Sequence, residues 1–425
     1  MKVFGITAPM SGSGKTTVVL GLLHKLRNSI SFKIGPDYID GYIHSAVSGR
    51  RAINIDRWLQ GRMYRNILGL YGKGYEYGIV EGVMGMYDSG SPMDLSTHYY
   101  FKNLNIPYIL VIDVSKLAES AYRISRGFFS KNLIGVIING YASDKHLEIV
   151  EAPFRKRGIR IIGRIPYREE MAVPERHLGL NTDILPEKIR TVAALVASYL
   201  DIDFTESLQD LPSSGSDHSM ISSSKYKIYI ARDNAFNFYY PTSLDTLMSI
   251  GRISFFSPLK GEIPENPDLI YLGGGYPELY AEKLSKNTKT LREIRNASGA
   301  GIPIIGECGG LMYLEKDMIV SKKRYPMTGI FSGKVVWRPK LTLGYTKLLA
   351  KDNSVIFREG DIVQGHEFHY SFIEDRGRKV FKNLIGKGID GHDGLSEKNT
   401  IGSYSHIDFI RYKKRIQKLM ISIRR

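Results

Sequence analysis

Short apolar runs alternate with amphipathic stretches through the first half of the chain. Runs rich in Ile and Val, bounded by turn residues, predict buried strands at Val3–Thr7, Gly78–Val80, Pro107–Asp113 and Leu133–Asn139. After the first of these strands, Val18–Arg27 has the periodicity of a helix. Strands that alternate with helices favour a parallel sheet covered on both faces, so we expect an α/β fold here.

A polar segment separates this half from a second set of apolar strands. Residues 210–225 are rich in Ser and contain Gly, Pro and Asp, a composition typical of a linker. Strand patterns resume at Lys227–Ala231, Leu269–Leu272 and Pro303–Gly306. Because 425 residues are too many for one ordinary core, we predict two α/β domains, 1–209 and 226–425.

The chain is basic, with 59 Lys and Arg against 43 Asp and Glu and a net charge of +16. Such a surface attracts nucleic acid, anionic membranes or polyanionic small molecules. Its densest basic run, 411–425, has apolar residues at helical spacing and predicts an amphipathic helix docked on its own domain. Those apolar residues are Ile416, Leu419, Met420 and Ile423.

Other features narrow the class of partner. The chain has no nucleic-acid recognition motif, no run near the ~20 apolar residues of a membrane helix, and no signal-peptide pattern at Met1. The single cysteine excludes an intrachain disulfide and fits a reducing compartment. We therefore expect a cytoplasmic protein with small-molecule partners, no nucleic acid and no membrane; a homodimer is compatible with the sequence.

Residues 7–17, Thr-Ala-Pro-Met-Ser-Gly-Ser-Gly-Lys-Thr-Thr, lie between a predicted strand and a predicted helix. Small residues there let backbone N–H groups face phosphate oxygens at a helix N-terminus. Pro9 breaks the strict Walker spacing and indicates a slightly longer loop, and an ordinary Gly-rich turn is the alternative. We expect Lys15 to reach the β- and γ-phosphates and Thr16 to ligate Mg²⁺. The expected cradle is Gly12, Ser13, Gly14, Lys15, Thr16 and Thr17.

Two groups of carboxylates follow predicted strands. Asp37 and Asp40 come shortly after Lys33, and Glu81 ends a buried strand ahead of Asp88. Ligands of open α/β sheets bind at the carboxyl edge, where a carboxylate suits Mg²⁺. A helix cap or a turn is the alternative for each acid taken singly. We interpret Glu81 as a metal ligand and the three aspartates as groups that orient an acceptor or a second metal.

Cys308 lies in Gly-Glu-Cys-Gly-Gly, which reads as the turn between a strand and a helix. Flanking glycines permit a strained elbow, and the nearby helix N-terminus favours loss of the thiol proton. An inert buried cysteine is the alternative. The Gly-rich segment 273–278 also follows a strand. The backbone N–H groups of Gly274, Gly275 and Gly309 are therefore candidates for an oxyanion hole.

A thiol nucleophile needs a base, and histidine is the usual one. His366 and His369 lie close together in Gly-His-Glu-Phe-His-Tyr-Ser, and His406 follows the last predicted strand. Isolated histidines are more often structural. His406 has Asp408 two residues later, which suits a base with an orienting acid.

Taken in order, these motifs resemble those of the cobyrinic acid a,c-diamide synthases, glutamine amidotransferases of corrinoid biosynthesis. The resemblance spans nearly the whole chain and includes 174–180 (Pro-Glu-Arg-His-Leu-Gly-Leu) and 231–240. It implies an N-terminal dethiobiotin-synthetase-like domain, built on a parallel sheet with a phosphate loop. It also implies a C-terminal class I glutaminase domain with a flavodoxin-like fold.

The resemblance also implies roles for individual residues. The nucleophile falls on Cys308 and its base on His406, while Asp408 stands where other class I enzymes have a glutamate. Lys15 and Lys33 would stabilise phosphoryl charge, Asn139 would read adenine, and Mg²⁺ would be held by Thr16, Glu81 and Asp56. The implied cofactors are ATP and Mg²⁺. The implied substrates are glutamine, ATP and a tetrapyrrole carboxylate that becomes an acyl phosphate.

The acceptor is left open by the sequence. Nickel-sirohydrochlorin diamide synthases share the same chemistry, and metal-free hydrogenobyrinate is a third acceptor. A phosphate-loop switch ATPase with an inactive glutaminase domain is the alternative of a different class. The intact Cys308, His406 and glycine elbow argue against it.

Overall fold

A computed structural model describes residues 1–90, 93–171, 186–211 and 225–422. The motif at 174–180, most of the predicted linker and Ile423 lie outside these residues. The chain divides into two compact units: Met1–Arg57 with Gly61–His218, and Trp58–Gln60 with Ser219–Arg425. Among the described residues, no helix has both the length and the apolar character needed to cross a bilayer.

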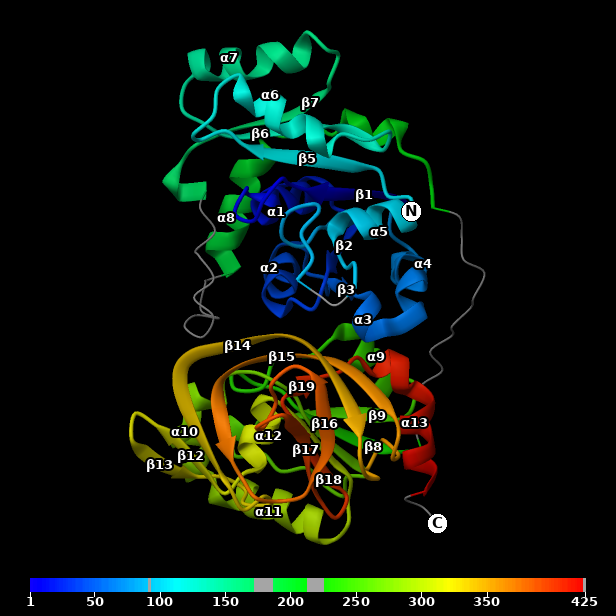
Figure 1. Cartoon of the computed structure of the whole chain (residues 1–425), viewed down its shortest axis with the longest axis vertical. Helices are drawn as coiled ribbons and strands as arrows, with labels where there is room; N and C mark the ends of the chain where they lie inside the picture. The colour runs from blue at the N-terminus through cyan, green and yellow to red at the C-terminus, as the bar shows by residue number, and fades with distance from the viewer. Residues whose placement is uncertain (91–92, 172–185, 212–224, 423–425) are drawn as a thin grey trace. The chain divides into compact units, whose positions relative to one another are not determined.

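The N-terminal unit is built on a seven-stranded parallel sheet of order β3-β2-β4-β1-β5-β6-β7 (Figure 1). Its strands are β1 (Lys2–Thr7), β2 (Ser29–Ile34), β3 (Ile53–Ile55), β4 (Tyr77–Glu81), β5 (Tyr108–Asp113), β6 (Leu133–Tyr141) and β7 (Ile161–Pro166). The four strands expected from apolar runs are all present. Both faces of the sheet are covered, which explains runs without polar alternation.

Helices cover the two faces of this sheet. They are α1 (Lys15–Lys25), α2 (Tyr38–Ser48), α4 (Ile67–Gly72), α5 (Thr97–Asn103), α6 (Ser120–Ser125), α7 (Asp144–Arg155) and α8 (Pro186–Ala197). Of the short helix α3 (Arg57–Gln60), residues Trp58–Gln60 belong to the other unit. Ile109 and Val111 of β5 pack in a core with α1 and α8, whereas Leu110 and Ile112 pack in another with α6 and α7. Successive side chains of one strand thus fill opposite layers.

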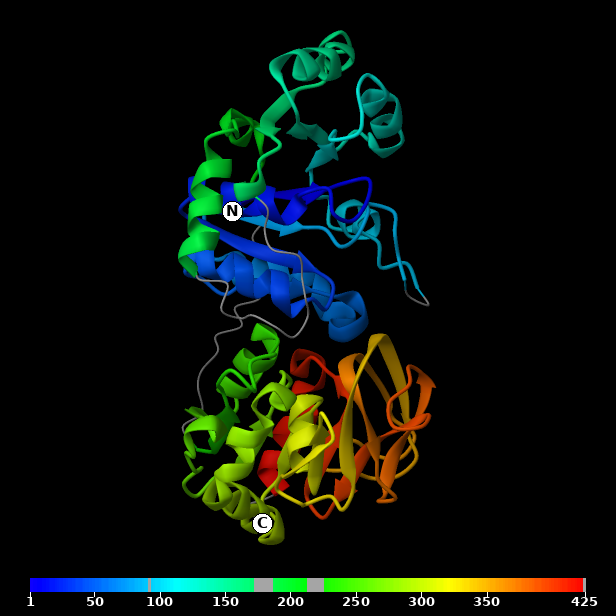
Figure 2. The same cartoon turned by 90° about the vertical axis from the view of Figure 1, so that its left-hand side faces the viewer.

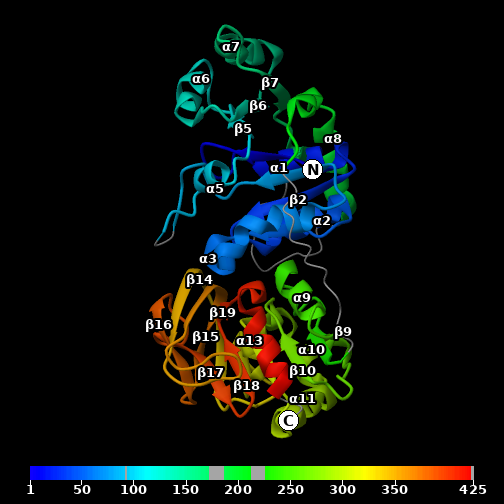
Figure 3. The same cartoon turned by 90° about the vertical axis from the view of Figure 1, so that its right-hand side faces the viewer.

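The C-terminal unit has a parallel core of order β9-β8-β10-β11-β18. These strands are β8 (Lys227–Ala231), β9 (Arg252–Phe256), β10 (Leu269–Leu272), β11 (Ile304–Glu307) and β18 (Thr400–Ser403). The helices are α9 (Pro241–Met248), α10 (Ala281–Lys286), α11 (Thr288–Gly299), α12 (Gly309–Leu314) and α13 (Phe409–Ser422). Tyr412, Ile416 and Met420 of α13 are buried, and α13 lies beside α9, as expected for an amphipathic helix docked on its own unit (Figure 3).

Further strands extend this core and were not predicted. They are β12 (Asp317–Val320), β13 (Lys323–Pro326), β14 (Lys334–Ala350), β15 (Ile362–Glu374), β16 (Lys379–Ile385), β17 (His392–Glu397) and β19 (Ser405–His406). They are paired antiparallel except for the parallel pair β12–β14. In Figure 2, β15, β16 and β17 (orange) lie on the side of the unit away from α10 and α11, whereas β13 contacts α10. The long β15 pairs with both β14 and the short β19, and so fixes the backbone of His406 opposite His366.

Candidate functional site

The phosphate loop joins β1 to α1 in the N-terminal unit. Gly12 and Gly14 have φ of +79° and +90°, in the left-handed region that glycine enters without a steric cost. A side chain at Gly14 would overlap the amide of Asn139, whose Nδ2 donates to the Ser13 carbonyl at 3.0 Å. The loop therefore curls tightly against β6, with Lys15 as the first residue of α1.

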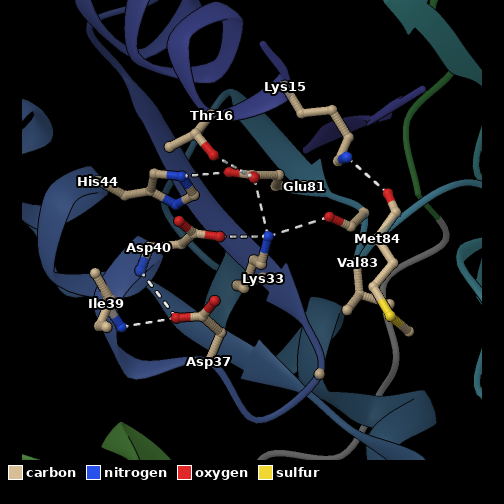
Figure 4. Close-up of polar contacts among 12 residues, drawn as sticks. Lys15, Thr16, Lys33, Asp37, Ile39, Asp40, His44, Glu81, Val83 and Met84 are labelled. Carbon is tan, nitrogen blue, oxygen red and sulfur yellow. Dashed lines mark hydrogen bonds and ion pairs between the residues drawn. The ribbon is translucent and has the colours of Figure 1, made fainter. Parts of the chain in front are cut away.

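Lys15 and the hydroxyl next to it occupy defined positions at this loop. Lys15 Nζ donates to the carbonyl oxygens of Met84, at 2.6 Å, and Met10, at 3.4 Å (Figure 4). Thr16 Oγ1 donates to Glu81 Oε1 at 2.8 Å. Because neutral carbonyls attract an ammonium group less than phosphate oxygens do, Lys15 is well placed to exchange them for a bound anion.

A buried network surrounds Glu81 at the carboxyl end of β4. Lys33 Nζ lies 2.9 Å from Glu81 Oε1 and 2.6 Å from Asp40 Oδ2. His44 Nε2 lies 2.6 Å from the other Glu81 oxygen. Figure 4 shows Lys33 between the two carboxylates. His44 was not predicted from the sequence; its spacing of four residues from Asp40 on α2 was the available signal.

Neighbouring charges determine the protonation states of Glu81 and Lys33. Burial alone would raise the pKa of Glu81, but Lys33 and His44 together hold that pKa well below its usual value. Burial likewise opposes the charge of Lys33, yet Asp40 and Glu81 raise its pKa. The Lys33 ammonium and the Glu81 carboxylate are therefore both ionised, and Lys33 neutralises Glu81.

The remaining predicted acids are arranged as follows. Asp37 Oδ1 caps α2 by accepting from the N–H groups of Ile39, at 2.8 Å, and Asp40, at 3.1 Å. The exposed Asp88 accepts from the Gly85 N–H at 2.9 Å. Asp56 is buried directly after β3. Since β3 pairs with β2 and β2 with β4, Asp56 lies at the same sheet edge as Glu81.

Hard oxygen donors in this network fit a magnesium ion. The Thr16 hydroxyl and the Glu81 carboxylate are already in contact at the carboxyl edge of the sheet. Among the described residues, no group of three His, Cys, Asp or Glu side chains is arranged to hold a metal by itself. An ion here would therefore need ligands from a bound phosphate as well.

Cys308 forms a strained elbow between β11 and α12 in the C-terminal unit. Its φ is +48° and its ψ is −99°, a conformation that costs a non-glycine residue free energy. A Cβ on Gly309 would lie 3.0 Å from Pro277 Cδ and 3.2 Å from the Gly275 nitrogen. Glycine at 309 allows this close approach of segment 273–278 to the nucleophile, because a side chain there would force its neighbours to shift by a few tenths of an ångström. Cys308 Sγ donates to the Phe368 carbonyl of β15 at 3.2 Å.

His406 lies fully buried against the same segment. A side chain on Gly274 would overlap the His406 ring. Burial lowers the pKa of His406 to about 3, and burial also raises the pKa of Cys308. The thiol and the imidazole are therefore both uncharged in this state.

An acid that the sequence analysis did not name lies beside His406. Glu307 Oε2 is 3.8 Å from His406 Nδ1 and accepts from the Tyr271 hydroxyl at 2.7 Å. Burial raises the pKa of Glu307 to about 8. Asp408 instead accepts from the Thr242 hydroxyl, at 2.5 Å. The position of Glu307 directly before the nucleophile was the only signal in the sequence.

The other two histidine candidates lie on β15. His369 stacks on Tyr404 with 3.7 Å between ring centroids, and its Nδ1 lies 2.7 Å from the Ser371 carbonyl. His366 packs against the ring of Tyr345 at 5.8 Å. These contacts are typical of structural histidines.

Comparison with known proteins agrees with this geometry. Residues 4–180 match the CobQ/CobB/MinD/ParA nucleotide binding domain, and residues 227–413 match the CobB/CobQ-like glutamine amidotransferase domain. The cobyrinate a,c-diamide synthase of Saccharolobus solfataricus is 37% identical, over 98% of this chain and 100% of that protein. Proteins of the same name from Sulfolobus acidocaldarius (37%, over 96% and 98%) and Caldanaerobacter subterraneus (35%, over 99% and 98%) are similar.

These matches confirm the resemblance drawn from the motifs, the two-part α/β fold and the nucleotide-binding character of the first unit. They also confirm that the chain is a glutamine-hydrolysing ligase. The chain belongs to the cobyrinate a,c-diamide synthase family.

Proposed function

We propose that this protein converts the a and c carboxylates of cobyrinate into amides, with ATP, Mg²⁺ and ammonia released from glutamine. The observation that carries the proposal is the presence, in one chain, of a phosphate loop beside the Thr16–Glu81 pair and of a cysteine elbow beside a buried histidine. The names of the relatives supply the acceptor.

The C-terminal unit would release the ammonia. Cys308 Sγ attacks the side-chain amide carbon of glutamine, and His406 takes the thiol proton and passes it to the departing ammonia. Water then hydrolyses the glutamyl thioester to glutamate and restores the thiol. The Gly309 N–H already faces Sγ, where it partly offsets the effect of burial on the thiol pKa. With Gly274 and Gly275 it would stabilise the oxyanion.

The N-terminal unit would activate the carboxylate. When bound, ATP with Mg²⁺ supplies the phosphoryl group that makes the carboxylate an acyl phosphate, which ammonia displaces. Thr16, Glu81 and Asp56 would hold the ion, and Lys15 would stabilise phosphate charge. Lys33, which Asp40 and Glu81 hold at this edge of the sheet, would add positive charge near the phosphoryl group. The remaining proposed groups are Gly12, Ser13, Gly14 and Thr17 around the phosphates, Asn139 at adenine, and Asp37, Asp40 and Asp88 at the acceptor.

Gly274→Ala should impair glutamine use selectively. The added methyl group overlaps His406, so the imidazole must move away from its position beside the elbow. We expect glutaminase activity to fall on the order of 100-fold, with ammonia-dependent amidation retained. Gly299→Ala, at the end of α11 with nothing within 4 Å of the new methyl group, is the matched control. Wild-type glutaminase activity in Gly274→Ala would mean that His406 is not the base.

Glu307→Gln should flatten the pH dependence of stability. The folded pKa of about 8 exceeds that of an unfolded glutamate, so the stabilisation is complete at low pH and is lost as pH rises toward 8. Between about pH 5.5 and about pH 8.5, the wild type should lose on the order of 2–4 kcal/mol more unfolding free energy than the variant. Urea unfolding at several pH values measures this. Glu282→Gln, at an exposed site on α10, is the control, and identical pH profiles for wild type and Glu307→Gln would contradict the prediction.

Candidate acceptors distinguish the proposal from its alternatives. Cobyrinate, hydrogenobyrinate and nickel-sirohydrochlorin are each incubated with enzyme, ATP, Mg²⁺ and glutamine, and the products are analysed by mass spectrometry. We expect two amides on cobyrinate. Conversion of nickel-sirohydrochlorin or hydrogenobyrinate alone would refute cobyrinate as the acceptor. ATP hydrolysis without any amidation would favour the switch ATPase.

A further inference from the structure

A buried acid next to the nucleophile has no role in the mechanism above. Glu278 lies in the 3₁₀ helix Pro277–Tyr280, at the end of the Gly-rich segment. Its side chain is only 8% exposed, and its Oε2 has no hydrogen-bond partner in the described part of the chain. Burying a carboxylate without a partner is costly, so a cationic group that binds beside Glu278 would be favoured.

Glu278 lies close to the place where a substrate amide must sit. After burial, the charge of Glu278 is the largest influence that raises the pKa of Cys308, which is consistent with this position. The neighbouring Pro277 packs against Gly309 at the base of the elbow. Burial also raises the pKa of Glu278 itself to about 7, the direction expected for a carboxyl group without a compensating cation.

Glutamine has a positively charged α-ammonium group that could pair with the Glu278 carboxylate. When its amide carbon is seated at the thiol, the α-ammonium group lies at the other end of a short, flexible side chain. We propose that the Glu278 carboxylate binds the α-ammonium group of glutamine and thereby selects glutamine over amides that lack an amino group. This inference rests on the proposed hydrolysis of glutamine at Cys308.

Binding of glutamine at Glu278 would also activate the Cys308 thiol. In the empty site, negative charge on Glu278 opposes formation of a Cys308 thiolate. An ammonium group bound to Glu278 cancels that charge, so the thiol becomes easier to deprotonate when glutamine is present. Water and simple amides do not bring this positive charge.

The test compares glutamine with glutaramate, which has the same amide and carboxylate but no α-amino group. We expect wild-type kcat/KM to be much higher for glutamine. Glu278→Gln should lower kcat/KM for glutamine on the order of 10- to 100-fold, as for loss of a charged hydrogen bond, mostly through KM. Its kcat/KM for glutaramate should be equal or higher, because the variant also removes the negative charge that opposes the Cys308 thiolate. Retained activity on glutaramate also shows that the variant is folded.

Glu282→Gln is the control, because this glutamate is exposed on α10 and pairs with Lys286. Equal losses for both substrates in Glu278→Gln would overturn the inference, since a purely structural residue acts on both alike. Retained preference for glutamine would also overturn it. A wild-type enzyme that hydrolyses no glutamine would instead refute the proposed function itself.

Discussion

Cys308→Ala should abolish glutamine-dependent amidation and leave amidation from free ammonia near the wild-type rate. Loss of the nucleophile removes thioester formation, with an expected fall on the order of 10⁴-fold or more in glutaminase kcat. The folding cost should be small, because alanine keeps the Cβ and the same backbone strain at φ +48°. Amidation rates with glutamine and with ammonium chloride as nitrogen source show whether the two reactions are independent.

Two results would contradict this account of Cys308. Loss of activity with both nitrogen sources, in a variant shown to be folded, would mean that the two reactions do not have separate sites. Undiminished glutamine use would mean that another group is the nucleophile. Cys308→Ser, with a similar volume and a weaker nucleophile, should behave like Cys308→Ala.

Lys15→Ala should stop amidation with either nitrogen source and spare glutaminase activity. Lys15 Nζ is held at the phosphate loop by two backbone carbonyls, and its removal leaves the phosphate charge without that counter-ion. We expect ammonia-dependent kcat to fall on the order of 10²–10³-fold, because catalysis of phosphoryl transfer is mainly positioning and electrostatic stabilisation.

The control for Lys15 is Lys102→Ala, which removes an exposed ammonium group on α5. This variant should retain amidation, which would show that the loss in Lys15→Ala does not come from removing any one positive charge. Wild-type ammonia-dependent amidation in Lys15→Ala would show that the loop does not bind the reacting phosphates.

The two sites share a resting state in which reactive groups are neutralised. In the N-terminal unit, Lys33 pairs with Glu81 and Asp40. In the C-terminal unit, burial keeps Cys308 and His406 uncharged.

The core strands, the phosphate loop and the cysteine elbow could be predicted from short stretches of the sequence. Apolar runs gave the core strands, and the glycines around Lys15 and Cys308 gave the loop and the elbow, because backbone conformation there depends on adjacent residues. The contact of Thr16 with Glu81 agrees with the expectation that the carboxyl ends of parallel strands meet at one edge.

Features that depend on contacts between residues far apart in the sequence were not predicted. In the antiparallel strands β14 and β15, buried positions are interrupted by partly buried or exposed ones, which is a weaker signal than a continuous apolar run. Glu307 reaches His406 across 99 positions of sequence, and His44 reaches Glu81 across 37. Nothing in the local sequence specifies such partners, so charge networks around a site emerge only from the fold.

The most direct test of the central claim uses glutamine labelled with nitrogen-15 in the side-chain amide. Enzyme, ATP, Mg²⁺, cobyrinate and this glutamine are incubated without added ammonium, and the product is analysed by mass spectrometry. The account predicts a diamide in which both new amide nitrogens are nitrogen-15, and no product when ATP is omitted. Unlabelled product, or no amide in an enzyme that hydrolyses both ATP and glutamine, would contradict it.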